Sequence, residues 1–145
     1  MTNHVIVEKV INASVDEVWR ALTDKEALKK WCFDIPDFDP APGAEFRFYG
    51  EGKNGEKFLH LCKVIEVKNA KKLSYSWKYD GYEGNSLVTF ELFPENNSTL
   101  VRVTHEGLET FPKTPDNAFA RENFTDGWTY LIGTSLKEYL EKRSV

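Results

Sequence analysis

The alternation of apolar and polar side chains between residues 44 and 107 most constrains what this chain can fold into. A period of two is typical of strands that bury one face. Here it runs through five segments separated by short turns, which predicts an antiparallel meander. The short segment of residues 4–11 is rich in β-branched side chains and predicts one strand ahead of the meander. The sequence therefore predicts a six-stranded antiparallel sheet.

The five segments differ in how clearly they separate their two faces. Phe46 and Phe48 share one face of the first segment, while charged residues take the other. The second, residues 57–67, is apolar on both sides, which predicts a long central strand covered on both faces or a strand that contains a bulge. The alternating residues of the last three segments include Leu73, Tyr79, Leu92, Thr99 and Val101, and the predicted inward residues among them are Tyr75, Trp77, Val88, Phe90, Val103 and His105.

Two helix-start signals follow the first strand. Ser14 and Glu17 have the spacing of a capping box, in which two side chains satisfy backbone amides reciprocally, and they predict a helix through residue 22. Thr23 and Glu26 repeat this spacing and predict a second helix through residue 30. We therefore expect two short helices between the first strand and the rest of the sheet.

After the strands the apolar period lengthens to three and four residues, which predicts a long amphipathic helix over residues 116–143. Thr114 followed by Pro115 is a plausible start for it. Gly127 and Gly133 fall in its interior, where each costs about 1 kcal/mol relative to Ala. They either let the helix approach the sheet closely or leave room for a ligand. The fold class predicted is α+β, with a curved sheet around the C-terminal helix.

Length and charge narrow the class of protein. The chain has 145 residues, which favours a single domain over residues 1–145, and its ten Phe, six Tyr and four Trp supply a large core. The formal net charge of -4 offers no attraction to phosphate backbones or anionic lipid. The first apolar stretch, residues 5–7, is too short for a secretion signal or a membrane span. We expect a cytoplasmic protein with no nucleic-acid and no membrane partner.

The cysteines and histidines predict neither a metal site nor a cofactor. Cys32 and Cys62 have no second cysteine close in the sequence, so we expect two reduced and largely buried thiols. His60 and His105 fall on predicted strands with no third ligand, which excludes a zinc motif. His105 either bonds a ligand or acts as a general base, or it is a satisfied core histidine.

The element order and several short motifs resemble a known family. A strand, two short helices, five antiparallel strands and one long helix is the order of the helix-grip fold of the START-like (SRPBCC) superfamily. The chain resembles bacterial relatives of the C-terminal domain of heat-shock-protein-90 ATPase activators over nearly its whole length. The residues that carry the resemblance are 18–24 (VWRALTD), Trp31, 73–77 (LSYSW), 88–92 (VTFEL), 101–105 (VRVTH), Gly127 and Trp128. Cys62 departs from the small Gly common at its position, and the additional N-terminal domain of the eukaryotic co-chaperones has no counterpart in this sequence.

The resemblance implies a cavity between the sheet and the C-terminal helix. The expected ligand-binding set combines inward strand residues, helix residues and two residues near the cavity mouth. It comprises Trp31, Phe33, Phe46, Phe48, Tyr75, Trp77, Phe90, His105, Trp128 and Leu131. Apolar walls with a few polar groups are typical of small-molecule sites. The alternative is that these aromatics pack against each other as core.

Three functions remain open. The first is a carrier, sensor or stress-related binding protein for a small hydrophobic molecule. The second is a co-chaperone-like module that binds a chaperone or another protein. The third is an enzyme of cyclase or hydrolase type that uses His105 or Tyr75 as acid or base; no catalytic residue is assigned for it.

Several other residues allow two interpretations. Arg47 either lies outside the sheet or anchors a ligand carboxylate inside the cavity. The proline-bearing loop of residues 34–42 is a candidate lid. Lys68, Lys71 and Lys72 are expected to form a solvated turn. The tyrosines that are candidate dimer contacts are Tyr49, Tyr79 and Tyr82.

Overall fold

A computed structural model describes residues 4–51, 55–115 and 118–142. Within these residues, six strands form one antiparallel sheet in the order β1-β6-β5-β4-β3-β2. The prediction of a six-stranded antiparallel sheet is confirmed. The strands are β1 (Val5–Ile11), β2 (Glu45–Glu51), β3 (Lys57–Lys68), β4 (Lys72–Tyr79), β5 (Ser86–Glu95) and β6 (Ser98–Glu106).

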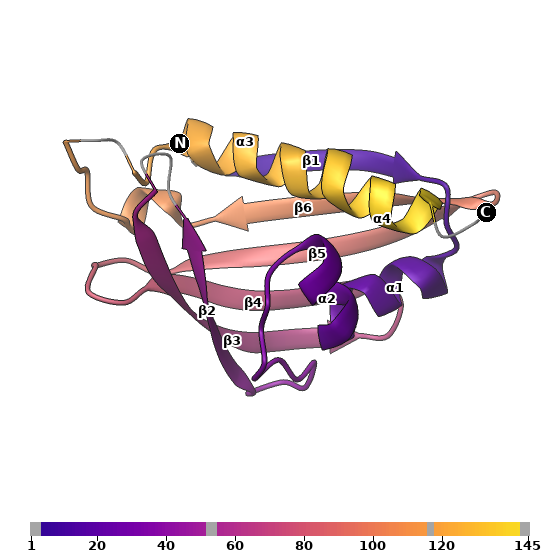
Figure 1. Cartoon of the computed structure of the whole chain (residues 1–145), viewed down its shortest axis with the longest axis horizontal. Coiled ribbons are helices and arrows are strands. Elements are labelled where there is room, and N and C mark those ends of the chain that lie inside the picture. Colours follow the sequence, from indigo (N-terminus) through magenta and orange to yellow (C-terminus); the bar gives the residue numbers. More distant parts are fainter. Residues whose placement is uncertain (1–3, 52–54, 116–117, 143–145) are drawn as a thin grey trace.

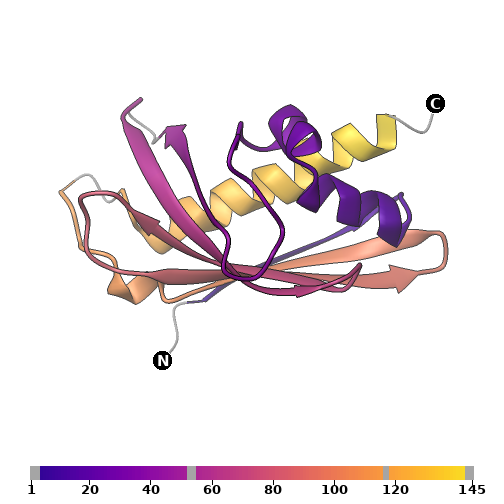
Figure 2. The same cartoon turned by 90° about the horizontal axis from the view of Figure 1, so that it is seen from below.

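The sheet curves around the C-terminal helix, as the helix-grip prediction requires. Figure 1 shows this helix lying along the strands, and Figure 2 shows β2 and β3 bending away from the rest of the sheet at one end. The helix consists of α3 (Arg121–Tyr130), a π-helical segment η2 (Leu131–Leu136) and α4 (Lys137–Lys142). The C-terminal end of this helix is flanked by α1 (Val15–Thr23) and α2 (Lys25–Trp31).

The two short helices have different N-terminal caps. Ser14 caps α1 through the predicted capping box: its hydroxyl accepts from the Glu17 amide, and Glu17 accepts from the Ser14 amide. The second predicted box is wrong. Thr23 is the last residue of α1, where its hydroxyl donates to the Trp19 carbonyl, and the Asp24 carboxylate caps α2 instead by accepting from Ala27. A side chain already bonded within one helix is not free to cap the next.

The long helix begins later than predicted. Its first residue is Arg121, so the cap expected at Thr114 and Pro115 is wrong; the expected ends at residues 116 and 143 lie outside the described residues. The Thr114 hydroxyl accepts from the Ala118 amide in a local turn. Phe119 then inserts into an aromatic cluster with only 8% of its surface exposed, which holds the segment before the helix against the sheet.

A bulge explains why residues 57–67 are apolar on both sides. β3 pairs with β4 in regular register up to Val64, and the register shifts between Val64 and Glu66. Ile65 is the extra residue and is 50% exposed. β3 lies inside the sheet between β4 and β2, but the alternative of cover on both faces is wrong, because Lys63 and Ile65 are exposed.

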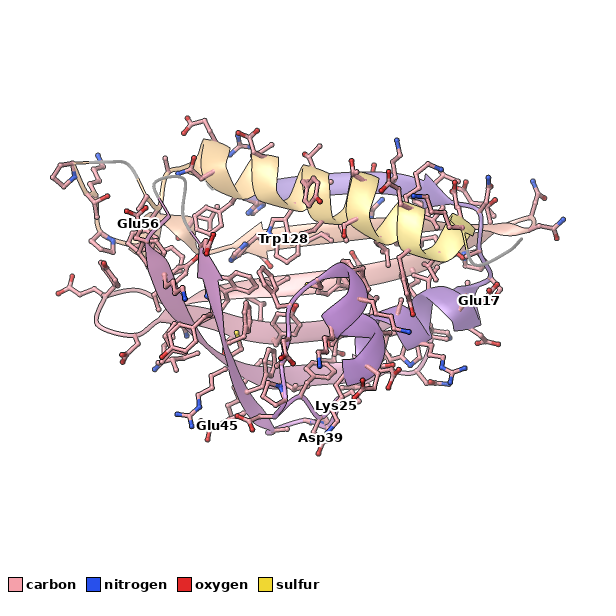
Figure 3. All side chains as sticks on the ribbon, viewed as in Figure 1. Glu17, Lys25, Asp39, Glu45, Glu56 and Trp128 are labelled. Atoms are coloured by element: carbon pink, nitrogen blue, oxygen red, sulfur yellow. The ribbon has the colours of Figure 1, made fainter. Side chains whose placement is uncertain are left out.

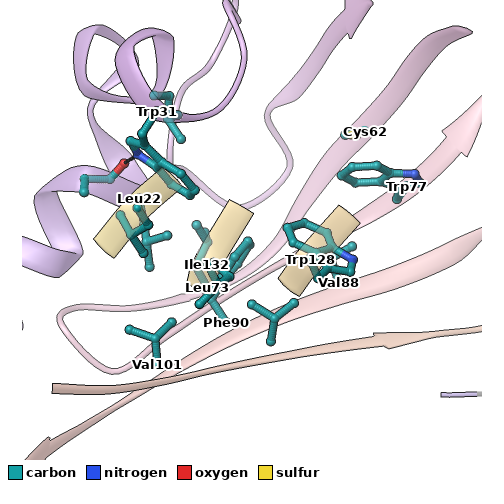
Figure 4. Packing of buried hydrophobic residues seen from close by; sticks show 14 of the residues in the cluster. Leu22, Trp31, Cys62, Leu73, Trp77, Val88, Phe90, Val101, Trp128 and Ile132 are labelled. Atoms are coloured by element: carbon teal, nitrogen blue, oxygen red, sulfur yellow. Dashed lines mark hydrogen bonds between the residues drawn. The ribbon is translucent and has the colours of Figure 1, made fainter. Parts of the chain in front are cut away.

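The core lies between the inner face of the sheet and the helices. Figure 4 shows Trp77, Val88 and Phe90 from the strands facing Trp128 and Ile132 of the C-terminal helix. The helical stripe buries Phe124, Trp128, Ile132, Leu136 and Leu140. None of the helices in the described ranges is long and apolar enough to cross a membrane.

Candidate functional site

A cavity of about 400 Å³ opens between the β2–β3 end of the sheet and α3. We call it the open cavity. Seven of its sixteen lining residues are Phe, Tyr or Trp, and Figure 3 labels two of the lining residues, Glu56 and Trp128. The lining residues are Phe33, Gly50, Glu51, Glu56, Phe58, His60, Trp77, Tyr79, Ala118, Phe119, Asn123, Phe124, Asp126, Gly127, Trp128 and Leu131.

Gly127 on the C-terminal helix and Gly50 on β2 both line this cavity. A side-chain Cβ at Gly127 would meet no atom within 4 Å, and the same holds for Gly133, so neither glycine lets the helix approach the sheet closely. That interpretation is wrong. Gly127 borders the open cavity and Gly133 does not. On β2, a Cβ at Gly50 would lie 2.8 Å from Cε1 of His60, so Gly50 makes space for the imidazole.

His60 is the most polar buried group in the cavity wall. It is 6% exposed, stacks on Phe48 with ring centroids 4.4 Å apart, and lies edge-on to Trp77 and Tyr79 at 4.8 and 4.7 Å. Nδ1 lies 3.0 Å from the Phe58 carbonyl oxygen. Because a carbonyl only accepts, Nδ1 carries the proton and Nε2 is an acceptor. Burial lowers the His60 pKa to about 4, so the ring is neutral at pH 7.

His105 is a satisfied core histidine. It is fully buried, Nδ1 accepts from Nε1 of Trp128 at 3.0 Å, and Nε2 lies 2.8 Å from the Ser86 hydroxyl. The Ser86 hydroxyl donates to the Trp77 carbonyl, so Nε2 donates to Ser86. Burial, and then the charge of His60, lower the His105 pKa to about 3. With both nitrogens engaged, His105 does not present a base to the cavity.

Tyr79 adds a hydroxyl to the same wall as His60. Its oxygen accepts from Nε1 of Trp77 at 2.9 Å, and burial raises the pKa of Tyr79. The phenol is therefore protonated at neutral pH and keeps a hydrogen to donate. Tyr79 is 7% exposed, so it is not the surface residue that was expected as a dimer contact, whereas Tyr49 and Tyr82 are 66% and 43% exposed.

The structure separates the ten expected ligand-binding residues into groups. Phe33, Trp77, Trp128 and Leu131 line the open cavity. The first three also border a second, small void of about 10 Å³. That void is otherwise enclosed by bulky side chains, including the expected residues Trp31, Phe48, Tyr75 and Phe90.

The remaining expected residues pack elsewhere. Phe46 packs edge-on against Phe38 and Tyr75, with ring centroids 5.1 Å away in both cases, and His105 lies behind Trp77 and Trp128. Neither lines the open cavity. Tyr75, the other candidate acid or base, also faces the small void only.

Sequence reasoning missed much of the cavity wall. The missed aromatic and imidazole side chains are Phe58, His60, Tyr79, Phe119 and Phe124, and the missed polar ones are Glu51, Glu56, Asn123 and Asp126. Phe58 and His60 belong to the strand whose faces were ambiguous, and Phe119 falls within the range expected to be helical.

The structure also places Arg47, the 34–42 loop and the lysine turn, for which the sequence allowed two interpretations. Arg47 lies outside the sheet, 3.8 Å from the Asp37 carboxylate with its side chain 70% exposed, so an anchor inside the cavity is wrong. In the 34–42 loop, Ile35 and Phe38 are buried against the small void rather than over the open cavity. Lys68 and Lys72 pair with Glu66 at the surface.

The surroundings of the two thiols do not make them reactive. Cys62 is buried and Cys32 half-buried, and burial raises the pKa of Cys32 to about 12 and that of Cys62 further. Both therefore remain protonated at neutral pH. Within the described ranges, no group of three or more His, Cys, Asp or Glu side chains is placed to hold a metal ion.

Comparison with known proteins identifies the family. The family model described as "Activator of Hsp90 ATPase homolog 1-like protein" matches residues 12–141. The chain belongs to this family. The START-like resemblance is thereby confirmed. No curated protein matches the chain.

Solved structures share the whole fold. Protein MLL2253 from Mesorhizobium loti is 28% identical, with a TM-score of 0.80 over 98% of this chain and 99% of that chain. Protein NE0264 from Nitrosomonas europaea is 26% identical, with a TM-score of 0.72 over 97% and 96%. DynU16, a protein of the dynemicin biosynthetic locus, is 25% identical, with a TM-score of 0.77 over 97% of this chain and 48% of that chain.

Proposed function

We propose that this protein binds a small hydrophobic molecule in the open cavity, as a carrier or sensor. The observation that carries the proposal is a space of about 400 Å³ walled by aromatic rings and open to solvent. Pockets of roughly 300–1,000 Å³ hold small ligands in other proteins. Family membership supports a ligand-binding or cyclase-like domain in general.

The polar groups of the wall favour binding over chemistry. His60 is neutral, with its Nε2 lone pair available, and Tyr79 keeps one hydroxyl hydrogen. They offer a ligand one acceptor and one donor inside an apolar wall, which is a typical source of orientation and specificity. His105 and Tyr75, the groups an acid–base enzyme was expected to use, do not line this cavity.

Native mass spectrometry of the protein purified from its own host tests the proposal. We expect a mass above that of the 16.7 kDa chain, and denaturation should release one apolar compound. The Gly127→Trp variant, which adds a large side chain at the cavity wall, should carry markedly less of it. If the host protein has the bare mass, and none of the hydrophobic probes described below binds, the proposal is overturned.

The second candidate is a module that binds a partner protein. The family description names an activator of the Hsp90 ATPase, and the outer face of the sheet carries a hollow of about 550 Å³. This hollow is charged, with Arg47, Lys63 and Lys78 beside Asp37 and Glu45. Reversing Lys63 and Lys78 to Glu should abolish co-purification of a bacterial Hsp90 homologue at low salt. If the wild-type chain captures no Hsp90, this candidate fails.

A further inference from the structure

The charged residues that line the open cavity are all acidic. Glu51, Glu56 and Asp126 border it, and no Lys or Arg does so within the described part of the chain; Lys53 lies outside that part. None of the three carboxylates forms an ion pair with a described cationic side chain. A cleft that carries one sign of charge beside apolar walls concentrates ligands of the opposite sign.

The His60 imidazole offers the cavity a hydrogen-bond acceptor. Nε2 of His60 meets no hydrogen-bond donor among the described residues, although the residue is only 6% exposed, while the Phe58 and Phe48 backbones engage the N–H of the ring. His60 lines the open cavity, and its unprotonated nitrogen Nε2 is the acceptor that the ring offers to a ligand. A neutral imidazole nitrogen of this kind binds an N–H or O–H group and does not bind a carboxylate.

The aromatic walls also suit a positive charge. Phe58, Tyr79 and Phe119 lie within 4.8 to 5.8 Å of one another by their ring centroids, and all three line the cavity. Aromatic faces attract cations through the ring quadrupole. Carboxylates, an acceptor nitrogen and aromatic faces thus favour the same ligand chemistry.

We propose that the open cavity selects hydrophobic amines in their protonated form, with the apolar body among the aromatic rings and the ammonium group near His60 and the acidic residues. This inference rests on the proposed function and names its ligand class. It predicts discrimination by charge among ligands of one shape.

Isothermal titration calorimetry at pH 7 and low salt with three matched probes tests it. The probes are 6-phenylhexylamine, 6-phenylhexanol and 6-phenylhexanoate, which share one apolar body. We expect the amine to bind about tenfold more tightly than the alcohol, because three carboxylates act on it through a partly solvated path. The carboxylate should bind more weakly than the alcohol.

Two triple variants separate local from global charge. In Glu51→Gln/Glu56→Gln/Asp126→Asn, the amine should lose its advantage over the alcohol, measured as the ratio of the two dissociation constants. The control, Glu26→Gln/Glu95→Gln/Glu138→Gln, changes the net charge equally at exposed residues that do not line the cavity, and it should keep the preference.

The hydrogen bond to His60 has its own test. 6-Phenylhexyl-trimethylammonium keeps the positive charge but has no N–H, so it should bind the wild type several-fold more weakly than the amine. The His60→Phe variant should remove that difference.

The outcomes are distinguishable. If the alcohol binds as tightly as the amine, or if the cavity triple variant keeps the amine preference, the inference is overturned while the proposed function stands. If none of the probes binds, the inference is overturned, and if the protein from its own host also has the bare mass, the proposed function is overturned with it.

Discussion

At the end of the interior covered by α2 and the following loop, the void measures about 10 Å³, whereas the cavity at the start of α3 measures about 400 Å³. We call these the closed end and the open end. Both lie on the same face of the sheet and under the same C-terminal helix. Phe33, Trp77 and Trp128 border both spaces and form the wall between them.

The difference comes from what covers the sheet. At the closed end, Trp31, Ile35 and Phe38 fill the interior from α2 and the loop after it. At the open end, Gly50 and Gly127 contribute no side chain. Aromatic content alone therefore does not decide whether an interior is filled. We infer that the closed end supplies stability and the open end supplies binding.

The largest expected effect is on stability. Phe90→Ala removes a ring that is 3% exposed at the closed end and should lower the free energy of unfolding by about 3–5 kcal/mol. Phe58→Ala removes the same ring from the open end, where Phe58 is half-buried beside existing space, and should cost roughly 1–2 kcal/mol. Urea denaturation of both variants measures the difference. Equal losses would show that the two ends are packed alike.

The next effect is the pH dependence of stability. The pKa values of His60 and His105 fall from 6.5 in the unfolded chain to about 4 and about 3 in the fold. Below pH 6.5 the unfolded state therefore binds protons that the native state does not. The free energy of unfolding is highest above pH 6.5 and should fall by about 2–4 kcal/mol between pH 7 and 5.

Two features sharpen this test. His60→Phe should halve the slope between pH 7 and 5, because it removes the titrating group of the open end and leaves His105 behind the wall. The pKa values of Glu66 and Glu141 are lowered below 4.5, chiefly by hydrogen bonds from Lys72 and the Asn12 amide, so they contribute only below this window. Urea midpoints that do not change from pH 7 to 5 would contradict the burial of both imidazoles.

A smaller effect separates the two helix glycines. Gly127→Trp should weaken binding of 6-phenylhexanol at least about tenfold, because the new side chain competes for the open cavity. Gly133→Trp places the same side chain six residues further along the helix, off the cavity, and should leave the affinity unchanged. Calorimetric titration of both variants gives the comparison. Similar losses in the two variants would place the ligand elsewhere.

The smallest effect concerns the contact between Gly50 and His60. Gly50→Ala should cost about 1 kcal/mol, because its Cβ would lie 2.8 Å from the imidazole. In a His60→Ala background the same change should cost almost nothing. The double-mutant cycle by urea denaturation should therefore show a coupling of about 1 kcal/mol. Additive effects would mean that the glycine has no role in seating the imidazole.

The sequence predicted the fold because its signals are local. Alternation along β2, β4, β5 and β6 places Phe46, Trp77 and Phe90 on the inner face in any register that buries that face. The stripe of the C-terminal helix likewise places Trp128 toward the sheet. These features need no knowledge of which elements meet.

The site was predicted only in part, because it depends on contacts between elements. Trp31 was expected near the cavity mouth, yet it closes the other end, where its indole nitrogen donates to the Ala21 carbonyl. The face of His60 was ambiguous because the bulge between Val64 and Glu66 interrupts the alternation of β3. Phe119 joins the wall because the helix starts after it, which the sequence pattern did not show.

The four tryptophans report at which end of the interior a ligand binds. Trp77 and Trp128 line the open cavity, Trp31 encloses the closed end, and Trp19 lies on α1. In ¹H–¹⁵N spectra, with the indole signals assigned through single Trp→Phe variants, titration with 6-phenylhexanol should shift the signals of Trp77 and Trp128 and leave those of Trp31 and Trp19 in place. Shifts dominated by Trp31 or Trp19, or no shift at saturating probe, would contradict binding at the open end.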